Sequence, residues 1–538
     1  MTVEPGKKIS APESGERDGA AMPESACSEA LESQAVEGAK SLGLDPDRIL
    51  AHWRRLFSSG PEEGGLTFEL LDTCRTDNGR LFKPESFSSC VNGLDDDLSG
   101  YAAFVPAAGA ASRYMAALEP LRKSVEAWDA AAIKRALKAL ETYRSVLPDV
   151  MQQKLSRPAD GVEVSDLKWL AELFTSPKAL LPCGPGGTSF LEQKAREHHY
   201  FDCLTLQIFV TPPGMVEKFR SCLSGEPGPE TVFFEQGKAC STLRFTPQGL
   251  PARDEDGGYS QVPSGHGALA GLFPVIAREH PQVEALFIRN IDNVCGVNAR
   301  CRDMTRMFLK AHRSVLKAVK EIRDELNGSN GSQTLDKPLR VLESVGVERP
   351  LSAEEQTFLT TVSKPRDRSL WKILFKLFQT PLSEAGQGGA PDLLRLFLRP
   401  VTFMGQVQNL GHDKGGSPVV IQTEDGPVSL CLERPHASLQ DQSEILDNPE
   451  KATHFNPVFV ATELQTQPQF NDAETDFWFT AKKTWQGKKV PYYETVLYAV
   501  LGNCKSMNCL FVEIPRFAFN PRKSLSDALV PVDDSVSG

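Results

Sequence analysis

The chain has 538 residues, of which 40% are hydrophobic and 24% charged, and its formal net charge is −11. These values are ordinary for a folded protein of two to four domains, and the acidic balance argues against a general nucleic-acid binder. No apolar run of roughly 18 residues occurs, so no membrane-spanning helix is expected. Twelve cysteines are scattered without a Cys-x-x-Cys pair, which favours reduced, buried thiols over a zinc site and indicates a cytoplasmic protein.

The first 45 residues are rich in carboxylates and contain no aromatic side chain. Such a composition buries too little apolar surface to order itself, so we expect a disordered acidic tail over residues 1–45. Asp45 then precedes a helical pattern with apolar residues on one face that runs to Leu56. We therefore expect a helical N-terminal segment over residues 46–98.

The apolar run from Ala102 to Val105 predicts a buried strand, which Pro106 ends. Five of the next six residues, Ala107 to Ser112, are Ala or Gly, and Arg113 follows. Main-chain amides with so little side-chain cover can bind an anion near a helix start, and the guanidinium of Arg113 can pair with a phosphate. The same residues also suit a tight strand-to-helix turn without a ligand.

Further along, a helical period over residues 118–147 is followed by strand patterns that alternate with helical ones, which indicates an α/β sheet. One strand delivers Asp292 to its carboxyl end, where ligands bind in open parallel sheets. A long amphipathic helix is expected over residues 298–326, and further helical patterns over 332–395. The predicted strands are 204–210, 232–235, 285–291, 401–407, 419–423, 428–432 and 510–514.

This order of elements predicts two halves of one catalytic unit, residues 99–300 and residues 396–530. A helical insertion or linker over residues 301–395 separates them, because Gly- and Ser-rich connections interrupt the helical patterns there. Residues 531–538 form a short tail.

Several stretches resemble motifs of the nucleotide-sugar pyrophosphorylases, specifically the UDP-sugar branch. The glycine-rich loop of that superfamily aligns with Pro106–Tyr114, and its Pro-Lys-x-Leu-Leu-Pro motif aligns with Pro177–Pro182. Its Gly-His-Gly motif aligns with residues 265–267, its Asp-Asn motif with residues 292 and 293, and its Leu-Glu-Thr motif with Tyr493–Thr495. Its C-terminal Val-Pro-Arg-x-Arg-Phe-x-Pro-Val-Lys motif resembles the region from Ile514 to Leu529.

A narrower resemblance is to DUF 4301, a bacterial domain family of unknown function, over roughly residues 46 to 530. It is carried by Pro106–Arg113, Gly265–Leu269, Asn290–Val294 and Thr453–Val458. That family brings no assigned activity.

Together these resemblances imply a glycosyltransferase-A-like, Rossmann-like α/β fold of the nucleotide-diphospho-sugar transferases: a mixed sheet flanked by helices, with a helical N-terminal segment and a helical insertion. The superfamily resemblance implies transfer of a nucleotidyl group from a nucleoside triphosphate, with UTP favoured, to a sugar 1-phosphate with release of pyrophosphate. The implied cofactor is Mg²⁺, and the implied partners are the triphosphate and the sugar phosphate, or a nucleotide sugar, with no nucleic acid and no membrane.

The same resemblance assigns roles to individual residues. Catalytic phosphate contacts fall to Arg113, Lys178 and Lys523, nucleotide contacts to Ala107, Ala108, Gly109, Ala110, Gly265, His266 and Gly267, sugar contacts to Asn456 and Glu494, and the metal to Asp292.

Each assignment has a structural alternative. Lys178 also suits a solvated loop, Asp292 a helix N-cap, and Asn456, before Pro457, a turn. Gly265 to Gly267 also suit a loop before a helix over residues 268–278. The basic residues from Lys482 to Lys489 are interpreted as a solvated loop.

The sequence also departs from the superfamily pattern. Ala108 and Ala111 stand where glycine is usual, Arg522 adds a charge beside Lys523, and no second metal carboxylate is evident. These departures leave open a catalytically silent nucleotide or nucleotide-sugar binder. A glycosyltransferase is a third alternative, but its Asp-x-Asp motif is matched only by Asp95–Asp97, before the first core strand.

Overall fold

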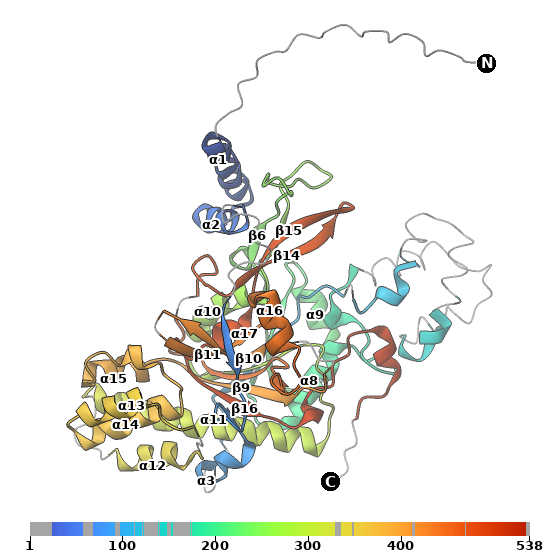
Figure 1. Cartoon of the computed structure of the whole chain (residues 1–538). Coiled ribbons are helices and arrows are strands. Elements are labelled where there is room, and N and C mark those ends of the chain that lie inside the picture. Colours follow the sequence, from blue (N-terminus) through green and yellow to red (C-terminus); the bar gives the residue numbers. More distant parts are fainter. Residues whose placement is uncertain are drawn as a thin grey trace, which may run out of the picture.

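Figure 1 shows a computed structural model of the chain. It describes residues 24–57, 68–91, 97–111, 113–120, 122, 138, 140–147, 152–153, 173, 175–226, 228–328, 335–346, 349–411, 415–424, 426–468 and 470–533. Most of the helix expected over residues 118–147 and most of the Asp95–Asp97 motif lie outside these ranges, as do residues 1–23.

A nine-stranded mixed sheet forms the centre of the molecule. The spatial order is β2 (Leu81–Phe82), β16 (Asn508–Glu513), β9 (Val401–Gln408), β13 (Phe459–Glu463), β8 (Ala285–Arg289), β3 (Tyr101–Pro106), β4 (Leu206–Thr211) and β5 (Glu230–Glu235), with β12 (His454–Phe455) beside β9. Strand β13 runs antiparallel to both of its neighbours, β8 and β9, whereas the pairs β3–β4, β3–β8, β4–β5, β9–β16 and β2–β16 are parallel.

Helices cover both faces of this sheet, and the mixed α/β class predicted from the sequence is confirmed. Because β3, β4 and β8 are buried along almost their whole length, most of their residues are apolar on both faces, and the strict alternation of a half-exposed strand is absent from these three sequences. One face packs against α8 (Phe190–Phe201) and α11 (Ala299–Leu326). The side chain of Asn298 caps the first turn of α11. The other face packs against η7 (His266–Leu272), α10 (Phe273–Glu279) and α17 (Leu497–Leu501).

Four helices between α11 and β9 gather on one side of the molecule, in yellow to orange in Figure 1. They are α12 (Asp336–Ser344), α13 (Ala353–Thr361), α14 (Pro365–Lys376) and α15 (Ala390–Phe397). Their apolar side chains join the same core cluster as α11, so this region packs onto the sheet as part of one body.

The N-terminal region differs from the expectation in two ways. The predicted disordered tail is wrong for Glu24–Leu42, which forms helix α1 and buries Ala35 and Ala39 against the helix that follows it and the region of β6 (Ser241–Leu243). Small alanine side chains allow this close approach although α1 has little apolar surface of its own. After α2 (Pro46–Phe57), the predicted helical segment contains strands as well: β1 (Leu70–Thr73) pairs with β10, and β2 joins the central sheet.

Two hairpin-like pairs of strands project beside α1 and α2 (Figure 1). They are β6 with β7 (Gln261–Pro263), and β14 (Trp478–Trp485) with β15 (Lys488–Thr495). The loop expected over residues 482–489 is therefore wrong, because these residues occupy paired strands joined by a two-residue turn. Gln486 and Gly487 both have positive φ, as a twisted hairpin turn requires.

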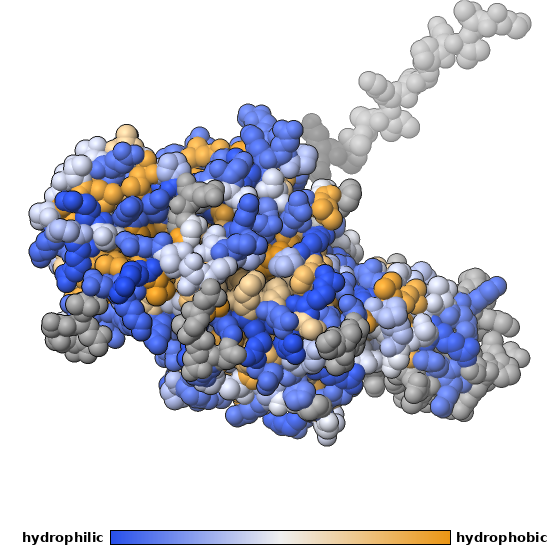
Figure 2. Space-filling view, turned by 90° about the horizontal axis from the view of Figure 1, so that it is seen from below, coloured by the Kyte–Doolittle hydropathy of each residue, from blue (hydrophilic) through white to orange (hydrophobic). Residues whose placement is uncertain are grey.

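A small antiparallel sheet of β1, β10 (Ser417–Thr423) and β11 (Gly426–Leu432) completes the core on the face that carries α17. Seen from below, hydrophilic residues cover most of the surface, with apolar residues in smaller groups between them (Figure 2). Among the described helices, none combines the length and the apolar character that crossing a membrane requires.

Candidate functional site

Four loops meet where parallel strands of the sheet end. Strands β3, β8 and β16 point the same way, so the segments that follow them leave from one edge. Main-chain hydrogen bonds join these segments: Lys178 N donates to Gly109 O (3.0 Å), Arg522 N to Asp292 O (2.9 Å), and Leu525 N to Tyr114 O (3.0 Å). Gly109, Lys178, Asp292 and Lys523 therefore belong to one continuous surface, as the sequence predicted.

Asp292 is the centre of this surface. Its Oδ2 accepts hydrogen bonds from Lys178 Nζ at 2.8 Å and Lys523 Nζ at 3.0 Å, and Lys178 Nζ also donates to Arg522 O at 2.6 Å. Burial alone would raise the pKa of Asp292, but the two lysines outweigh it and the pKa is lowered. Two ammonium groups thus share one carboxylate, which leaves an excess positive charge that favours a bound anion.

The lysines differ in how firmly they are held. Lys178 is buried, with its ammonium over the rings of Tyr114 and Phe190 at 5.2 Å from each ring centroid, so the solvated-loop alternative is wrong. Burial lowers the pKa of Lys178, and the positive charges of Lys523 and Arg113 act in the same direction against Asp292. The side chain of Lys523 is half exposed and is available to a ligand.

Asp292 has one carboxylate oxygen that a magnesium ion could bind. Asp292 Oδ1 is buried and makes no hydrogen bond, whereas both amide atoms of Asn293 bind the main chain of residues 518 and 520. Among the described residues no cluster of three or more His, Cys, Asp or Glu side chains is arranged to hold a metal. Mg²⁺ commonly takes one or two carboxylates and completes its shell with substrate phosphates and water, and that arrangement suits Asp292.

The small-residue loop is open where a ligand must approach. Gly109, Ala110 and Arg113 are exposed, and a Cβ on Gly109 would meet no atom within 4 Å. Ala108 is half-buried, whereas Ala107 and Ala111 are buried. The methyl group of Ala111 packs in the cluster with Tyr114 and Phe190, so this departure from glycine places no obstacle on the exposed surface. Ser112 lies outside the described residues.

The glycines of the Gly-His-Gly motif are explained by packing against the chain. A Cβ on Gly265, which has φ +90°, would lie 2.4 Å from Thr495 O, and one on Gly267 would lie 2.6 Å from Val496 N. Thr495 N also donates to Ser264 O at 2.9 Å. The motif therefore fixes the end of β15, and the expected approach of a pyrimidine ring to these glycines is not needed to explain them.

His266 keeps a free donor beside this contact. Its Nδ1 accepts a hydrogen bond from Leu497 N at 3.1 Å, which places the imidazole proton on Nε2. The residue is exposed, yet the surrounding protein desolvates the ring and lowers its pKa, so the imidazole is neutral at pH 7. A neutral Nε2–H donor can recognise a carbonyl or a phosphate oxygen.

Two alanine substitutions separate these roles of glycine. Gly267→Ala is expected to lower the free energy of unfolding by about 1–3 kcal/mol, because its methyl group overlaps the Val496 main chain. The methyl group of Gly109→Ala meets no protein atom, so the stability of this variant should equal that of the wild type. Chemical denaturation of both variants measures the two effects. Equal stability of the two variants would contradict the packing role of Gly267.

Glu494 interacts electrostatically with Glu433, a residue that the sequence analysis missed. Glu494 on β15 pairs with Lys483 on β14, and its carboxylate acts electrostatically on Glu433, which follows β11. Burial raises the pKa of Glu433 to about 7, Glu494 adds to the effect, and Arg113 opposes it. The signal in the sequence was a carboxylate directly after a buried strand, the same signal that pointed to Asp292.

The titration of Glu433 predicts a pH-dependent difference in stability. Because the folded-state pKa is raised from 4.5 to about 7, the folded chain binds more protons than the unfolded chain between these values, and stability falls as pH rises through the window. Relative to Glu433→Gln, the wild type should lose about 1–2 kcal/mol between pH 4.5 and pH 7 after allowance for solvent screening. Denaturation of both proteins at several pH values measures the difference, and parallel curves would contradict it.

Asn456 serves the fold. Its Nδ2 donates to Gly405 O and its Oδ1 accepts from Val458 N, both at 2.8 Å. These contacts support the turn into β13, where Val458 has φ +58°, a conformation that β-branched residues rarely adopt. The structure therefore favours the turn alternative for Asn456 over a free sugar contact. Arg522 also stabilises the fold, because its guanidinium donates hydrogen bonds to the main-chain carbonyls of Asp527, Val530 and Pro531.

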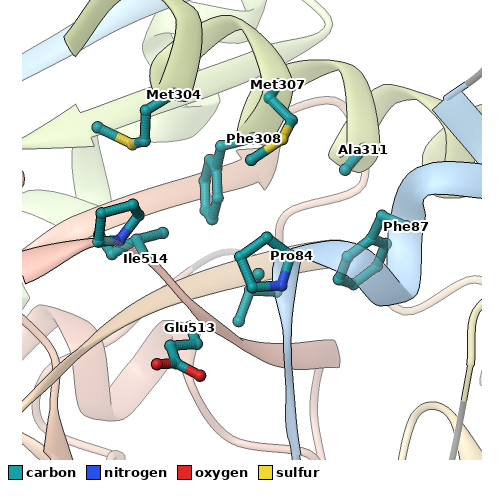
Figure 3. A pocket seen from close by; sticks show the side chains of 10 residues that line it. Pro84, Phe87, Met304, Met307, Phe308, Ala311, Glu513 and Ile514 are labelled. Carbon is teal, nitrogen blue, oxygen red and sulfur yellow. The ribbon is translucent and has the colours of Figure 1, made fainter. Parts of the chain in front are cut away.

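A separate apolar pocket lies between α11 and the end of β16 (Figure 3). Its lining residues are Pro84, Phe87, Met304, Met307, Phe308, Ala311, Val512, Glu513, Ile514 and Pro515. With Glu513 as its one charged lining residue, it offers none of the cations that a polyanion needs.

One family model matches the C-terminal part of the chain. The family model described as "Domain of unknown function (DUF4301)" matches residues 371–533, which confirms the resemblance to that family over this part of the chain. No curated protein matches the sequence significantly.

Two solved structures are similar over most of the chain. A UDP-glucose phosphorylase from Trypanosoma brucei is 12% identical, with a TM-score of 0.45, over 93% of this chain and 78% of that one. A structure described as a UDP-N-acetylglucosamine pyrophosphorylase from Entamoeba histolytica is 11% identical, with a TM-score of 0.41, over 85% of this chain and 82% of that one.

Proposed function

We propose that the chain is a nucleotidyltransferase that moves a nucleotidyl group, with UTP favoured, onto a sugar 1-phosphate and releases pyrophosphate. The observation that carries this proposal is the meeting of Gly109, Lys178, Asp292 and Lys523 at one edge of the sheet, through the contacts given above. An exposed main-chain loop, two ammonium groups and one carboxylate suit a polyanion with a bound divalent cation.

The reaction needs alignment and charge neutralisation more than covalent help. A phosphate oxygen of the sugar phosphate attacks the α-phosphorus, and pyrophosphate leaves. Lys178, held between Asp292 Oδ2 and Arg522 O, presents a fixed positive charge to the phosphates. The exposed Arg113 and half-exposed Lys523 can follow the charge as it moves to the leaving group. Mg²⁺, when bound through Asp292, would supply Lewis-acid stabilisation of the phosphate oxygens.

The remaining candidate side chains fall into two groups, one for the nucleotide base and one for the sugar. His266 offers a neutral Nε2–H beside the Ser264–Thr495 contact and is the candidate for the nucleotide base. Glu494 and Glu433 are the candidates for sugar hydroxyls, because carboxylates accept hydrogen bonds from diols. Arg113 links the sugar group to the phosphate contacts, because its charge lowers the pKa of both Glu433 and Lys178.

The experiment combines turnover with binding. The purified full chain is given Mg²⁺, each of the four common nucleoside triphosphates and a panel of sugar 1-phosphates, and pyrophosphate release is measured. Release with one pair, and its loss in Asp292→Ala, is the expected result. Tight binding of a triphosphate without release for any pair would favour the silent binder. A folded protein that binds no nucleotide and no nucleotide sugar would overturn both.

A further inference from the structure

A fully buried group of charges lies directly beneath the loop that carries Asp292. Lys194 and Glu197 project from α8, and Arg289 ends β8; all three side chains are inaccessible to solvent. Glu197 Oε2 accepts from Lys194 Nζ at 3.1 Å and from Arg289 at 2.8 Å, while its Oε1 accepts from Gly296 N at 3.0 Å. Lys194 and Arg289 also both donate to Asn293 O.

Cys295 lies within this group. The Arg289 guanidinium, which stays charged at all accessible pH values, donates to Cys295 Sγ at 2.8 Å. Cys295 comes just before α11, and Cys301 sits in the first turn of that helix, where the helix N-terminus adds positive potential. The Cys301 thiol donates to Cys295 O at 2.8 Å, which holds the two cysteines next to each other.

These surroundings favour the ionised form of Cys295. The hydrogen bond from Cys301, working against burial and together with the charges of Arg289 and Lys194, lowers the pKa of Cys295; Glu197 acts in the opposite direction. The pKa of Cys301 is raised, chiefly by its hydrogen bond to Cys295 and then by burial. An activated thiolate next to a protonated thiol is the arrangement found in oxidation-sensitive cysteine pairs.

We propose that Cys295 and Cys301 form an oxidation-sensitive dithiol that takes a small peroxide as its oxidant and closes to a disulfide. The Cys295 thiolate attacks one oxygen of hydrogen peroxide, the O–O bond breaks, hydroxide leaves and Cys295 becomes a sulfenic acid. The Cys301 sulfur then attacks Cys295 Sγ, the S–O bond breaks, and water leaves with the proton of the Cys301 thiol. The dithiol loses two electrons and the peroxide gains them.

Formation of the disulfide removes the negative charge of the Cys295 thiolate. That charge lies next to Lys194 and Arg289, the two buried cations that donate to the Asn293 carbonyl. Because Asn293 adjoins Asp292, oxidation at this pair changes the support of the phosphate-site loop without touching the site itself. The pair is thus placed to link the redox state of the surroundings to the shape of the Asp292 loop.

Peptide mapping tests the proposal without relying on any catalytic activity. The folded, reduced full chain is exposed to increasing hydrogen peroxide, free thiols are alkylated in denaturant, and the protein is cut with trypsin. Cleavage after Arg289, Arg300 and Arg302 places Cys295 in peptide 290–300 and Cys301 in the dipeptide 301–302. The expected product is peptide 290–300 carrying the dipeptide through a disulfide, at peroxide concentrations that leave other thiols free.

Two other cysteines serve as internal controls because they are more exposed than Cys295. Cys203 is 9% exposed against 5% for Cys295, and Cys222 is more exposed than either; burial raises the pKa of Cys203 to about 12 and also raises that of Cys222. Exposure alone therefore predicts that these two oxidise first, whereas activation predicts that Cys295 does.

Two variants complete the test. Cys301→Ser removes the resolving thiol, so Cys295 should accumulate as a sulfenic acid that dimedone traps, whereas the matched control Cys222→Ser should still form the linked peptide. A Cys295 that keeps its free thiol after Cys203 or Cys222 has oxidised, or oxidation of no thiol at all, would overturn the proposal.

Discussion

Asp292→Ala is expected to slow pyrophosphate release at least about 100-fold while leaving triphosphate binding intact or stronger. The substitution removes the carboxylate proposed to hold the metal, yet it also frees two ammonium groups that Asp292 Oδ2 neutralises at 2.8 and 3.0 Å. Charge on the site therefore becomes more positive when the carboxylate is lost. Single-turnover assays and calorimetric titration with a triphosphate measure the two effects separately.

Lys178→Met should behave in the opposite way and lose triphosphate affinity, because its buried ammonium is fixed on the same surface. Lys218→Met, at an exposed position on α9 (Val216–Cys222), is the matched control and should bind as the wild type does. Equal loss of binding in the Asp292 and Lys178 variants would contradict the division of roles. Circular dichroism verifies that each variant is folded.

Glu197→Ala is expected to lower the free energy of unfolding by about 3–5 kcal/mol, the usual cost of leaving buried charges unpaired. Glu197 neutralises Arg289 at 2.8 Å and Lys194 at 3.1 Å, and none of these side chains reaches solvent. Urea denaturation, with the slope compared between proteins, measures the loss.

The matched control for that change is Glu217→Ala on α9, which breaks an ion pair with Arg220 at the same spacing as the Lys194–Glu197 pair. Both of its side chains are largely exposed, so its removal should cost less than about 1 kcal/mol. Losses of similar size in the two variants would show that burial does not set the strength of the Glu197 contacts.

The convergence of Gly109 and Asp292 could be predicted from local signals in the sequence. Asp292 follows a buried strand and Gly109 lies in a run of small residues after another strand. Parallel strands bring their carboxyl ends to one edge, so these two positions were expected to lie close together. Lys178 and Lys523 were added to them by the resemblance to the nucleotide-sugar pyrophosphorylases, because a single lysine in a loop carries no local signal of its own.

Features that depend on distant contacts were not predictable in the same way. Gly265 and Gly267 are glycines because the chain near Thr495 packs on them, and nothing in their own sequence shows that partner. The Lys194–Glu197–Arg289 group joins a helix to a strand end far along the chain. Single charged residues in apolar patterns do not indicate which partner neutralises them.

The formation of helix α1 was likewise not predictable from its own sequence. Its composition is acidic and poorly apolar, so the local pattern predicted disorder. Ala35 and Ala39 are buried in a cluster with Ile49 and Trp53 of α2 and with Leu243 and Phe245. Tertiary packing therefore decided the structure of a segment whose own propensity was weak.

A crystal structure of the full chain with Mg²⁺ and a non-hydrolysable UTP analogue tests the central claim most directly. Our account predicts the phosphates over Gly109, with oxygens at about 3 Å from Lys178 Nζ or Lys523 Nζ and the metal beside Asp292. Phosphates bound elsewhere, for example in the polar groove of Tyr200, Arg302 and Arg306, with the Asp292 surface left unchanged, would contradict it.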